Sequence, residues 1–192
     1  SSRQVRLAIV VTLVSAGLLS AGEGTRIYLK AILAQLLLET AWSQTLAGHA
    51  RARPWPWADT WPVARLRAPV QQEDLIVLAG ASGSTLAFGP AHMLASAVPG
   101  SDDNVVLAGH RDTHFAFLEH LQIGEVLELD SADGTSHRYR VTDLAIVHQT
   151  QTSVMAQTGL KSLTLITCWP FDAIVPGGPM RYVVRAVADA SL

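Results

Sequence analysis

The chain has 192 residues, a formal net charge of -2 at pH 7 and a single cysteine. This length is enough for one domain with a buried core, and a lone cysteine excludes an intramolecular disulfide. The basic residues are scattered and the calculated pI is about 6.4, so the sequence lacks the clustered positive charge of a nucleic-acid-binding protein. We therefore exclude nucleic acid as a partner.

The N-terminal segment is predicted to be a membrane anchor. Residues 7–22 read LAIVVTLVSAGLLSAG, without any charge, and Arg3 and Arg6 precede them. A membrane-spanning helix needs about 17 to 25 apolar residues, whereas the apolar region of a cleavable signal has about 7 to 15. The basic residues in front favour an uncleaved signal anchor over residues 1–22. A cleaved signal peptide and a buried core helix are the alternatives.

Residues 23–48 are predicted to form an amphipathic helical segment. Their apolar residues recur at helical spacing and form one broad face, which comprises Tyr28, Ile32, Leu33, Leu36 and Leu37. The catalytic or binding domain, a membrane surface and a partner protein are all candidates to cover this face.

Residues 49–70 are predicted to be an extended connector. The segment holds four prolines, Pro54, Pro56, Pro62 and Pro69, which are too many for a helix or a central strand. Its tryptophans, Trp55, Trp57 and Trp61, are expected to pack on a sheet or to lie near a membrane interface, because an aromatic side chain buries a large area.

Residues 71–192 are predicted to form an all-β domain. Short apolar runs alternate with turn signals, and they occupy residues 75–80, 84–89, 104–110, 125–130, 137–147, 162–168 and 180–188. Strands at this spacing, without long helical patterns between them, indicate a sandwich or a barrel. The clearest hairpin spans residues 125–141, with Asp133 and Gly134 in its turn. Short helices are expected within residues 90–100 and 152–159.

Three residues with complementary chemistry lie at strand ends. Cys168 ends one predicted strand, His110 ends another and Arg181 begins a third. A thiolate is a nucleophile, an imidazole transfers protons, and a guanidinium donates hydrogen bonds to a developing oxyanion. These roles together suit acyl transfer. From the residues alone, a lone cysteine packed as a small hydrophobic side chain remains the alternative.

The sequence blocks around these residues resemble those of the sortase family. LAGHRDTHF contains His110, TLITCWP contains Cys168, and RYVVRA begins with Arg181. The resemblance runs from about residue 74 to residue 188, with the three blocks in the family's order. It implies a closed, roughly eight-stranded β-barrel with short helices, preceded by an N-terminal transmembrane or helical segment. The GHRDT form of the histidine motif resembles a variant from Gram-negative bacteria.

The resemblance also implies an activity and a set of roles. Cys168 is expected to be the nucleophile, His110 the general acid and base, and Arg181 the oxyanion and substrate clamp, with Thr167 and Trp169 as substrate-binding residues. The implied substrate is an exported protein with an LPXTG-like C-terminal sorting signal, which is transferred through a thioacyl-enzyme to an amine acceptor. No cofactor is implied, and the catalytic domain is expected on the periplasmic or extracellular face of the membrane.

Three other interpretations remain open. His110, His114 and His120 are close enough in sequence to suggest a metal site, but no clear further ligand completes it, so we predict no metal. A thiol hydrolase would use the same three residues and pass the acyl group to water. A non-catalytic anchored β-domain would keep Cys168 packed and unreactive.

Overall fold

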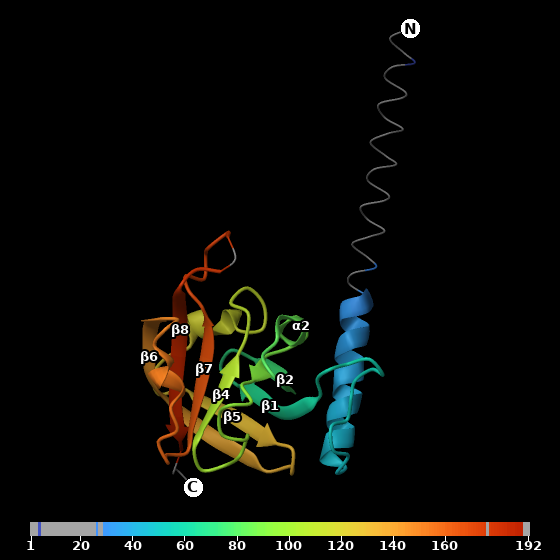
Figure 1. Ribbon diagram of the computed structural model, residues 1–192, viewed down its shortest axis with the longest axis horizontal. Coiled ribbons are helices and arrows are strands. Elements are labelled where there is room, and N and C mark those ends of the chain that lie inside the picture. Colours follow the sequence, from blue (N-terminus) through green and yellow to red (C-terminus); the bar gives the residue numbers. More distant parts are fainter. Residues whose placement is uncertain (1–3, 5–25, 27–28, 176, 190–192) are drawn as a thin grey trace. The chain divides into compact units, whose positions relative to one another are not determined.

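The computed structural model describes residues 4, 26, 29–175 and 177–189. Eight strands within these residues form a closed barrel in the order β1-β2-β3-β4-β7-β8-β6-β5 (Figure 1). The strands are β1 (Pro62–Ala68), β2 (Glu73–Ala79), β3 (Ala91–His92), β4 (Asn104–Ala108), β5 (Val126–Ser131), β6 (Ser136–His148), β7 (Ser162–Cys168) and β8 (Met180–Ala188). Three short helices connect them, namely α2 (Gly83–Leu86), η1 (Ala116–His120) and η2 (Thr152–Met155). The predicted all-β barrel is confirmed.

The pairing of β1 with both β2 and β5 closes the barrel. Most neighbouring strands are antiparallel, but β2 pairs with β3 and β4 pairs with β7 in parallel. Parallel strands present their carboxyl ends at the same edge of a sheet. The C-terminal ends of β4 and β7 therefore lie next to each other, although more than fifty residues separate them in the sequence.

The core fills the barrel with side chains from alternate positions of each strand. In β1, for example, Ala64, Leu66 and Ala68 are buried while the residues between them are partly exposed, as expected for a strand with one face inward. Tyr139 of β6 and Phe115 are the largest fully buried side chains. Continuous burial of this kind provides the rigid frame on which the loops are held.

Strand β1 lies inside the segment that the sequence predicts to be a connector, so the barrel begins before residue 71. Its prolines are compatible with a strand, because Pro62 is the first residue and Pro69 follows the last one. The number of prolines in residues 49–70 argues against a strand, but the residues between Pro62 and Pro69 alternate between buried and partly exposed positions as a strand requires. The barrel therefore includes Pro62–Ala68, and the connector prediction is wrong for these residues.

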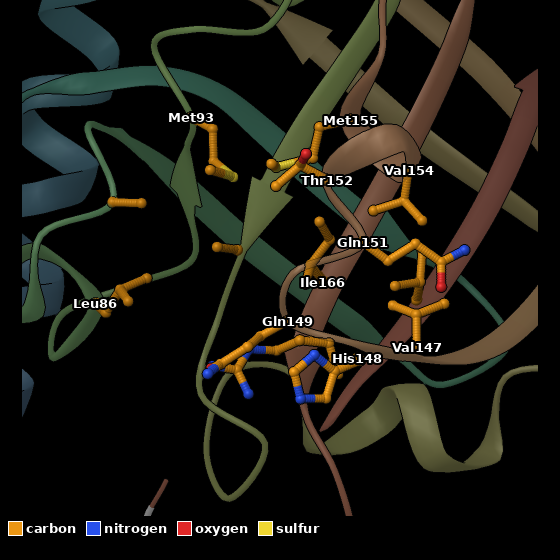
Figure 2. Close-up of a pocket in the computed structure, with 14 residues that line it drawn as sticks. Leu86, Met93, Val147, His148, Gln149, Gln151, Thr152, Val154, Met155 and Ile166 are labelled. Atoms are coloured by element: carbon orange, nitrogen blue, oxygen red, sulfur yellow. The ribbon is translucent and has the colours of Figure 1, made fainter. Parts of the chain in front are cut away.

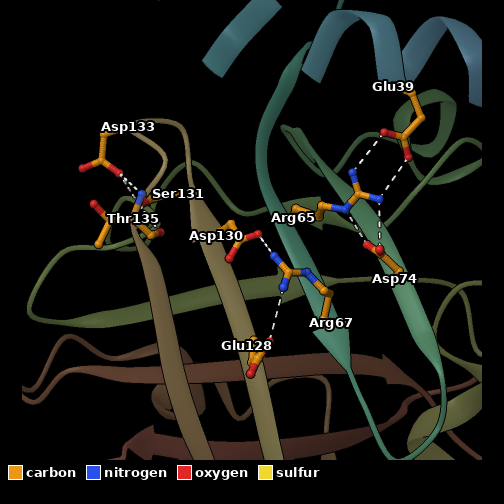
Figure 3. A network of polar contacts seen from close by, with 9 residues as sticks. All are labelled: Glu39, Arg65, Arg67, Asp74, Glu128, Asp130, Ser131, Asp133 and Thr135. Carbon is orange, nitrogen blue, oxygen red and sulfur yellow. Dashed lines mark hydrogen bonds and ion pairs between the residues drawn. The ribbon is translucent and has the colours of Figure 1, made fainter. Parts of the chain in front are cut away.

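The outward-facing arginines of β1 join it to its neighbours (Figure 3). Arg65 contacts Asp74 of β2 at 2.5 Å and Glu39 at 3.0 Å. Arg67 contacts Glu128 at 3.3 Å, and it also pairs with Asp130, both on β5. The two arginines thus tie together the strands that close the barrel.

Two segments differ in type from their predictions. Residues 84–89, expected to be a strand, instead contain α2, whose N-cap Ser82 accepts a hydrogen bond from the backbone N–H of Thr85 at 3.3 Å. Residues 90–100, expected to hold a short helix, contain the two-residue strand β3. A serine at an N-cap stabilises the first turn of a helix, and this local signal outweighs the apolar run that follows it.

The predicted hairpin is formed by β5 and β6. Gly134 in its turn has a φ of +83°, which suits glycine. Asp133 accepts hydrogen bonds from the hydroxyl of Ser131 at 2.7 Å and from the backbone N–H of Thr135 at 2.9 Å (Figure 3). These bonds hold the pKa of the Asp133 carboxyl at about 2.

The chain divides into two compact units, residues 1–37 and 38–192. In the first unit the described residues 29–37 are helical, and in the second unit residues 38–46 are helical. In the second unit Leu38 and Trp42 pack against Ile76 and Leu78 of β2. The predicted anchor, residues 1–22, lies outside the described residues apart from Gln4. Among the helices in the described part of the chain, none is long and apolar enough to cross a membrane.

Candidate active site

Cys168 is the last residue of β7 and faces outward from the barrel. Leu163 and Leu165 belong to the barrel core, so alternation places Thr164, Ile166 and Cys168 on the opposite, outer face. Cys168 is partly exposed and forms no disulfide. The thiol is therefore at a strand end and within reach of molecules in solution.

Arg181 lies directly opposite Cys168. The antiparallel register of β7 and β8 pairs these two residues, and residues paired in this way project from the same face with their Cβ atoms about 4.5 to 5.5 Å apart. The guanidinium of Arg181 donates to the carbonyl oxygens of Gly178 and Met180, each at 2.8 Å, and to Oε1 of Gln149 at 2.9 Å. Its side chain is therefore held by two backbone carbonyls and by Gln149.

His110 follows β4 at the same edge of the barrel. The parallel register pairs Ala108 with Ile166, and the backbone N–H of Gly109 continues the ladder by donating to the carbonyl of Ile166 at 3.2 Å. His110 lies two residues after Ala108, and Cys168 lies two residues after Ile166. The register of the two strands therefore brings His110 and Cys168 close together. The imidazole of His110 is exposed, as a group that exchanges protons with a substrate must be.

The glycine before His110 is required by packing. A Cβ atom at Gly109 would lie 2.6 Å from Cγ of Phe115, a distance that real contacts do not reach. Phe115 is fully buried, and its backbone N–H donates to the carbonyl of His110 at 3.0 Å. The Gly-His pair thus allows the chain to turn tightly around a core aromatic ring directly after β4.

Thr167 connects the two segments that carry the cysteine and the histidine. Its side chain is 2% exposed, and its hydroxyl donates to the carbonyl of Gly109 at 2.8 Å. A side chain that is buried and bonded within the protein does not fit the predicted direct contact with substrate. Thr167 instead links the end of β7 to the residue before His110.

Trp169, the other predicted substrate contact, packs within an aromatic cluster. Its ring stacks on Tyr182 with centroids 5.8 Å apart and meets the edge of Phe171 at 5.7 Å. Tyr182 and Phe171 pack against the barrel core. Trp169 is partly exposed, so it combines a packing role with a position beside the thiol.

Arg111, whose role is not predicted from the sequence, holds the loop between β7 and β8. It is 7% exposed, and its Nη2 donates to the carbonyl oxygens of Ala173 at 2.9 Å and Val175 at 3.0 Å. Its Nη1 is buried and finds no partner among the described residues. A buried cation next to His110 therefore fixes the loop that leads from Cys168 to Arg181.

His114 lies near His110 without joining it in a cluster of ligands. Burial lowers the pKa of His114 below its usual value, and the nearby His110 lowers it further. The His114 imidazole is therefore neutral at pH 7. Its Nδ1 lies 3.4 Å from the hydroxyl of Thr113. Within the residues that the structure describes, no group of three or more histidine, cysteine or acidic side chains is arranged to hold a metal ion.

A pocket of about 410 Å³ opens beside Arg181 on the outer face of the barrel. In Figure 2, Leu86 and Met93 lie on one side of it and Val147 and Val154 on the other. Its floor is formed by β4, β7 and β8, and η2 with the residues before it forms one wall. The lining residues are Ala81, Leu86, Met93, Ala108, Val147, His148, Gln149, Gln151, Thr152, Val154, Met155, Ile166, Arg181 and Val183. This mostly apolar groove is suited to the side chains of an extended peptide.

Comparisons with known proteins point to one family. The family model described as "Sortase domain" matches residues 66–189. Sortase D of Bacillus subtilis (strain 168) is 32% identical over 120 residues, which cover 62% of this chain and 60% of that protein. This chain thus accounts for less than two thirds of its curated relative.

Solved structures agree with this match. Sortase C-1 from Actinomyces oris is 26% identical, with a TM-score of 0.60 over 67% of this chain and 74% of that one. The lid mutant of sortase A from Corynebacterium diphtheriae is 24% identical, with a TM-score of 0.61 over 82% of this chain and 94% of that one, and it supports the fold. The matched segment contains the strand ends that carry His110, Cys168 and Arg181, and the chain belongs to the sortase family.

Proposed function

We propose that this chain cleaves an LPXTG-like C-terminal sorting signal of an exported protein and transfers that protein to an amine acceptor. The observation that carries the proposal is the cross-strand pairing of Cys168 with Arg181 on the outer face of the barrel. The ladder between β4 and β7 leads to His110 at the same edge. Nucleophile, oxyanion donor and proton carrier are thus available at one place, which is the set that acyl transfer requires.

In the first half-reaction the Cys168 thiolate attacks the threonyl carbonyl carbon of the sorting signal. A carbon–sulfur bond forms and the carbonyl oxygen becomes an oxyanion, to which the N–H groups of Arg181 donate. When this intermediate collapses, the peptide carbon–nitrogen bond breaks and His110 protonates the leaving amine. The product is a thioacyl-enzyme, and the C-terminal part of the signal departs.

In the second half-reaction an amine attacks the thioester carbon. His110 removes a proton from this amine, a new carbon–nitrogen bond forms, and the carbon–sulfur bond breaks to return the thiolate. One amide bond replaces another, so the sum needs no oxidant, reductant or cofactor. The guanidinium of Arg181 already donates from Nη1 to the carbonyls of Gly178 and Met180 and from Nη2 to Gln149. A guanidinium has five N–H donors, so we propose that its Nε–H and second Nη2–H donate to the bound signal while these three bonds hold the side chain in place.

The segments around the barrel support an assignment of the chain's parts. We propose that residues 1–22 anchor the protein in a membrane, that residues 23–48 form a helical segment, and that the part of the connector before Pro62 leads into the catalytic domain. The catalytic barrel is then outside the cytoplasm, where exported proteins are available. The GHRDT motif and the net acidity favour a Gram-negative variant with a periplasmic domain.

The direct test is turnover of LPXTG peptides, with every residue represented at X, by the wild type and three variants. Cys168→Ala and His110→Ala are expected to abolish cleavage. Arg181→Lys is expected to reduce turnover by about 10²- to 10³-fold, since lysine cannot reproduce the two parallel donors of a guanidinium. If the Cys168→Ala variant turned over the peptides at the wild-type rate, Cys168 would be excluded as the nucleophile.

Two matched variants serve as controls. Arg185 lies four residues after Arg181 on β8, opposite Thr164 rather than Cys168, so Arg185→Ala should retain most of the turnover. His114→Ala should also retain it if only His110 transfers protons. Added amine distinguishes transpeptidation from hydrolysis, because a transpeptidase incorporates the amine into product whereas a hydrolase releases the acid.

A further inference from the structure

The loop between β6 and β7 is held in place by two consecutive residues, Asp103 and Asn104, at the start of β4. Asp103 precedes the strand, and its Oδ1 accepts hydrogen bonds from the backbone N–H groups of Asn104 at 2.8 Å, Thr158 at 2.8 Å and Gly159 at 3.1 Å. These three bonds hold the pKa of the Asp103 carboxyl below its usual value, and the bond from Thr158 has the largest effect. The carboxylate thus fixes the C-terminal part of the loop to β4.

Asn104 fixes the part of the loop that contains η2. Its side-chain Nδ2 donates to the carbonyl oxygens of Val154 and Ala156, each at 3.3 Å. Its Oδ1 accepts from the hydroxyls of Thr164 at 2.8 Å and Ser162 at 3.4 Å on β7. The residue is 5% exposed, and these four bonds use the full capacity of the amide.

The backbone of Asn104 adds a further link. Its carbonyl oxygen accepts a hydrogen bond from Nε2 of Gln157 at 3.1 Å. One residue therefore joins β4, β7 and three positions of the loop. A buried amide whose bonds are all satisfied specifies one geometry, since any displacement leaves a polar group unpaired.

The loop that Asn104 holds is the wall of the pocket beside Arg181. Thr152, Val154 and Met155 line that pocket, and Val154 also packs with Val147 and Val183 on the outer face of the barrel. A carbonyl of the same Val154 accepts the Asn104 bond. The position of the wall relative to the floor is thus set by hydrogen bonds from Asn104, a residue that does not line the groove.

We propose that Asn104 is a positioning residue that sets the width of the peptide groove, and that it thereby determines substrate affinity without contacting the substrate. The inference rests on the proposed function and adds that the sorting signal occupies this groove, which Arg181 lines. Asn104 is the first residue of β4, and His110 follows the other end of the strand. A change at the Asn104 side chain is therefore expected to alter the wall while the backbone ladder of β4 keeps the segment before His110 in place.

Asn104→Asp is the most discriminating variant. Aspartate keeps the shape and still accepts from Thr164 and Ser162, but it has no N–H to donate and turns a carboxylate oxygen toward the carbonyls of Val154 and Ala156. We expect KM for the LPXTG peptides to rise by about tenfold with kcat within about threefold of the wild type, since loss of ground-state and transition-state binding together raises KM alone. Hydrogen exchange at the amides of residues 152–159 should accelerate.

Two measurements keep the outcome clear. The rate of Cys168 alkylation by iodoacetamide should be unchanged, because the thiol lies at the opposite end of β7. Thr158→Ala on the same loop is the matched control. It keeps the bond from the Thr158 backbone to Asp103 and loses a long bond of 3.4 Å from the N–H of Leu160 to the Thr158 hydroxyl, so KM and exchange at residues 152–157 should stay unchanged. If Asn104→Asp does not fold, Asp103→Ala removes the other anchor and should give the same rise in KM and in exchange.

Wild-type KM together with wild-type exchange in Asn104→Asp would overturn the proposal, as would a loss confined to kcat. Failure of the proposed function looks different, because the wild type itself would then not turn over the peptides. In that case the exchange measurement would still report whether Asn104 holds the loop.

Discussion

Replacing Thr167 with valine tests whether this residue positions the catalytic segments or contacts the substrate. Valine has nearly the shape of threonine, so the substitution leaves no cavity, but it removes the hydroxyl that donates to the Gly109 carbonyl at 2.8 Å. The site is 2% exposed, and water therefore does not replace the lost donor. The link between the end of β7 and the residue before His110 is broken.

The size of the effect follows from the burial of this bond. A buried polar group left without its partner costs about 1 to 3 kcal/mol, and we expect Thr167→Val to lower the free energy of unfolding by about 1 to 2 kcal/mol because Gly109 keeps its ladder bond to Ile166. In a domain of this size that corresponds to a decrease in Tm of about 2 to 8 °C. We also expect kcat to decrease by about tenfold with KM unchanged, because His110 loses part of its support.

Urea unfolding and steady-state kinetics on the same preparations measure both quantities. Thr167→Ser is the control: it retains the hydroxyl and loses one methyl, worth about 0.8 kcal/mol of burial, so it should lose stability while it keeps kcat. If Thr167→Val instead raises KM and leaves kcat and stability unchanged, Thr167 contacts the substrate and the positioning role is wrong.

Other substitutions test the packing around the site. Tyr139→Phe should stabilise the protein by about 1 kcal/mol in urea unfolding, because the buried Tyr139 hydroxyl has no partner in the described part of the chain. Burial, with a smaller effect of a nearby carboxylate, raises the pKa of this hydroxyl to about 12. A loss of stability in the variant would contradict this. Gly109→Ala should destabilise by about 1 to 3 kcal/mol in the same measurement, since the new Cβ collides with Phe115, and unchanged stability would show that the ring moves freely. Arg111→Met should accelerate hydrogen exchange in the loop between β7 and β8, because two bonds from a buried cation are lost; equal exchange would refute the role of this residue as an anchor. Burial lowers the pKa of His92 in the folded protein. The unfolded chain therefore binds a proton more readily, and the free energy of unfolding decreases as the pH falls below about 6.5. In urea unfolding between pH 5 and 8, His92→Gln should lose less stability at acidic pH than the wild type.

The strands that carry the candidate catalytic residues were predictable because their signals are local. Apolar runs that end in turn residues mark the ends of β4 and β7, and Gly134 marks the hairpin. The alternation in β7 also contains the information that Thr167 points inward, since Leu163 and Leu165 do. The same alternation assigns Thr167 and Cys168 to opposite faces of β7.

What the sequence did not reveal depends on contacts between distant segments. A basic residue in a turn, such as Arg111, is expected to be exposed, and it becomes buried only because the loop containing Ala173 packs over it. Asn104 likewise gains its partners from a loop some fifty residues away. Strand β1 is hard to recognise in the sequence because it lies in a segment with four prolines, although Pro62 and Pro69 lie only at its two ends.

Mass spectrometry of the intact protein during turnover tests the central claim most directly. The enzyme is mixed with LPXTG peptides without an added amine, quenched in acid, and digested to locate any adduct. The account predicts an added mass equal to the peptide up to its threonine, located on Cys168 and removed by hydroxylamine as a thioester should be. Turnover with no adduct on Cys168, or an adduct that persists in Cys168→Ala, would contradict it.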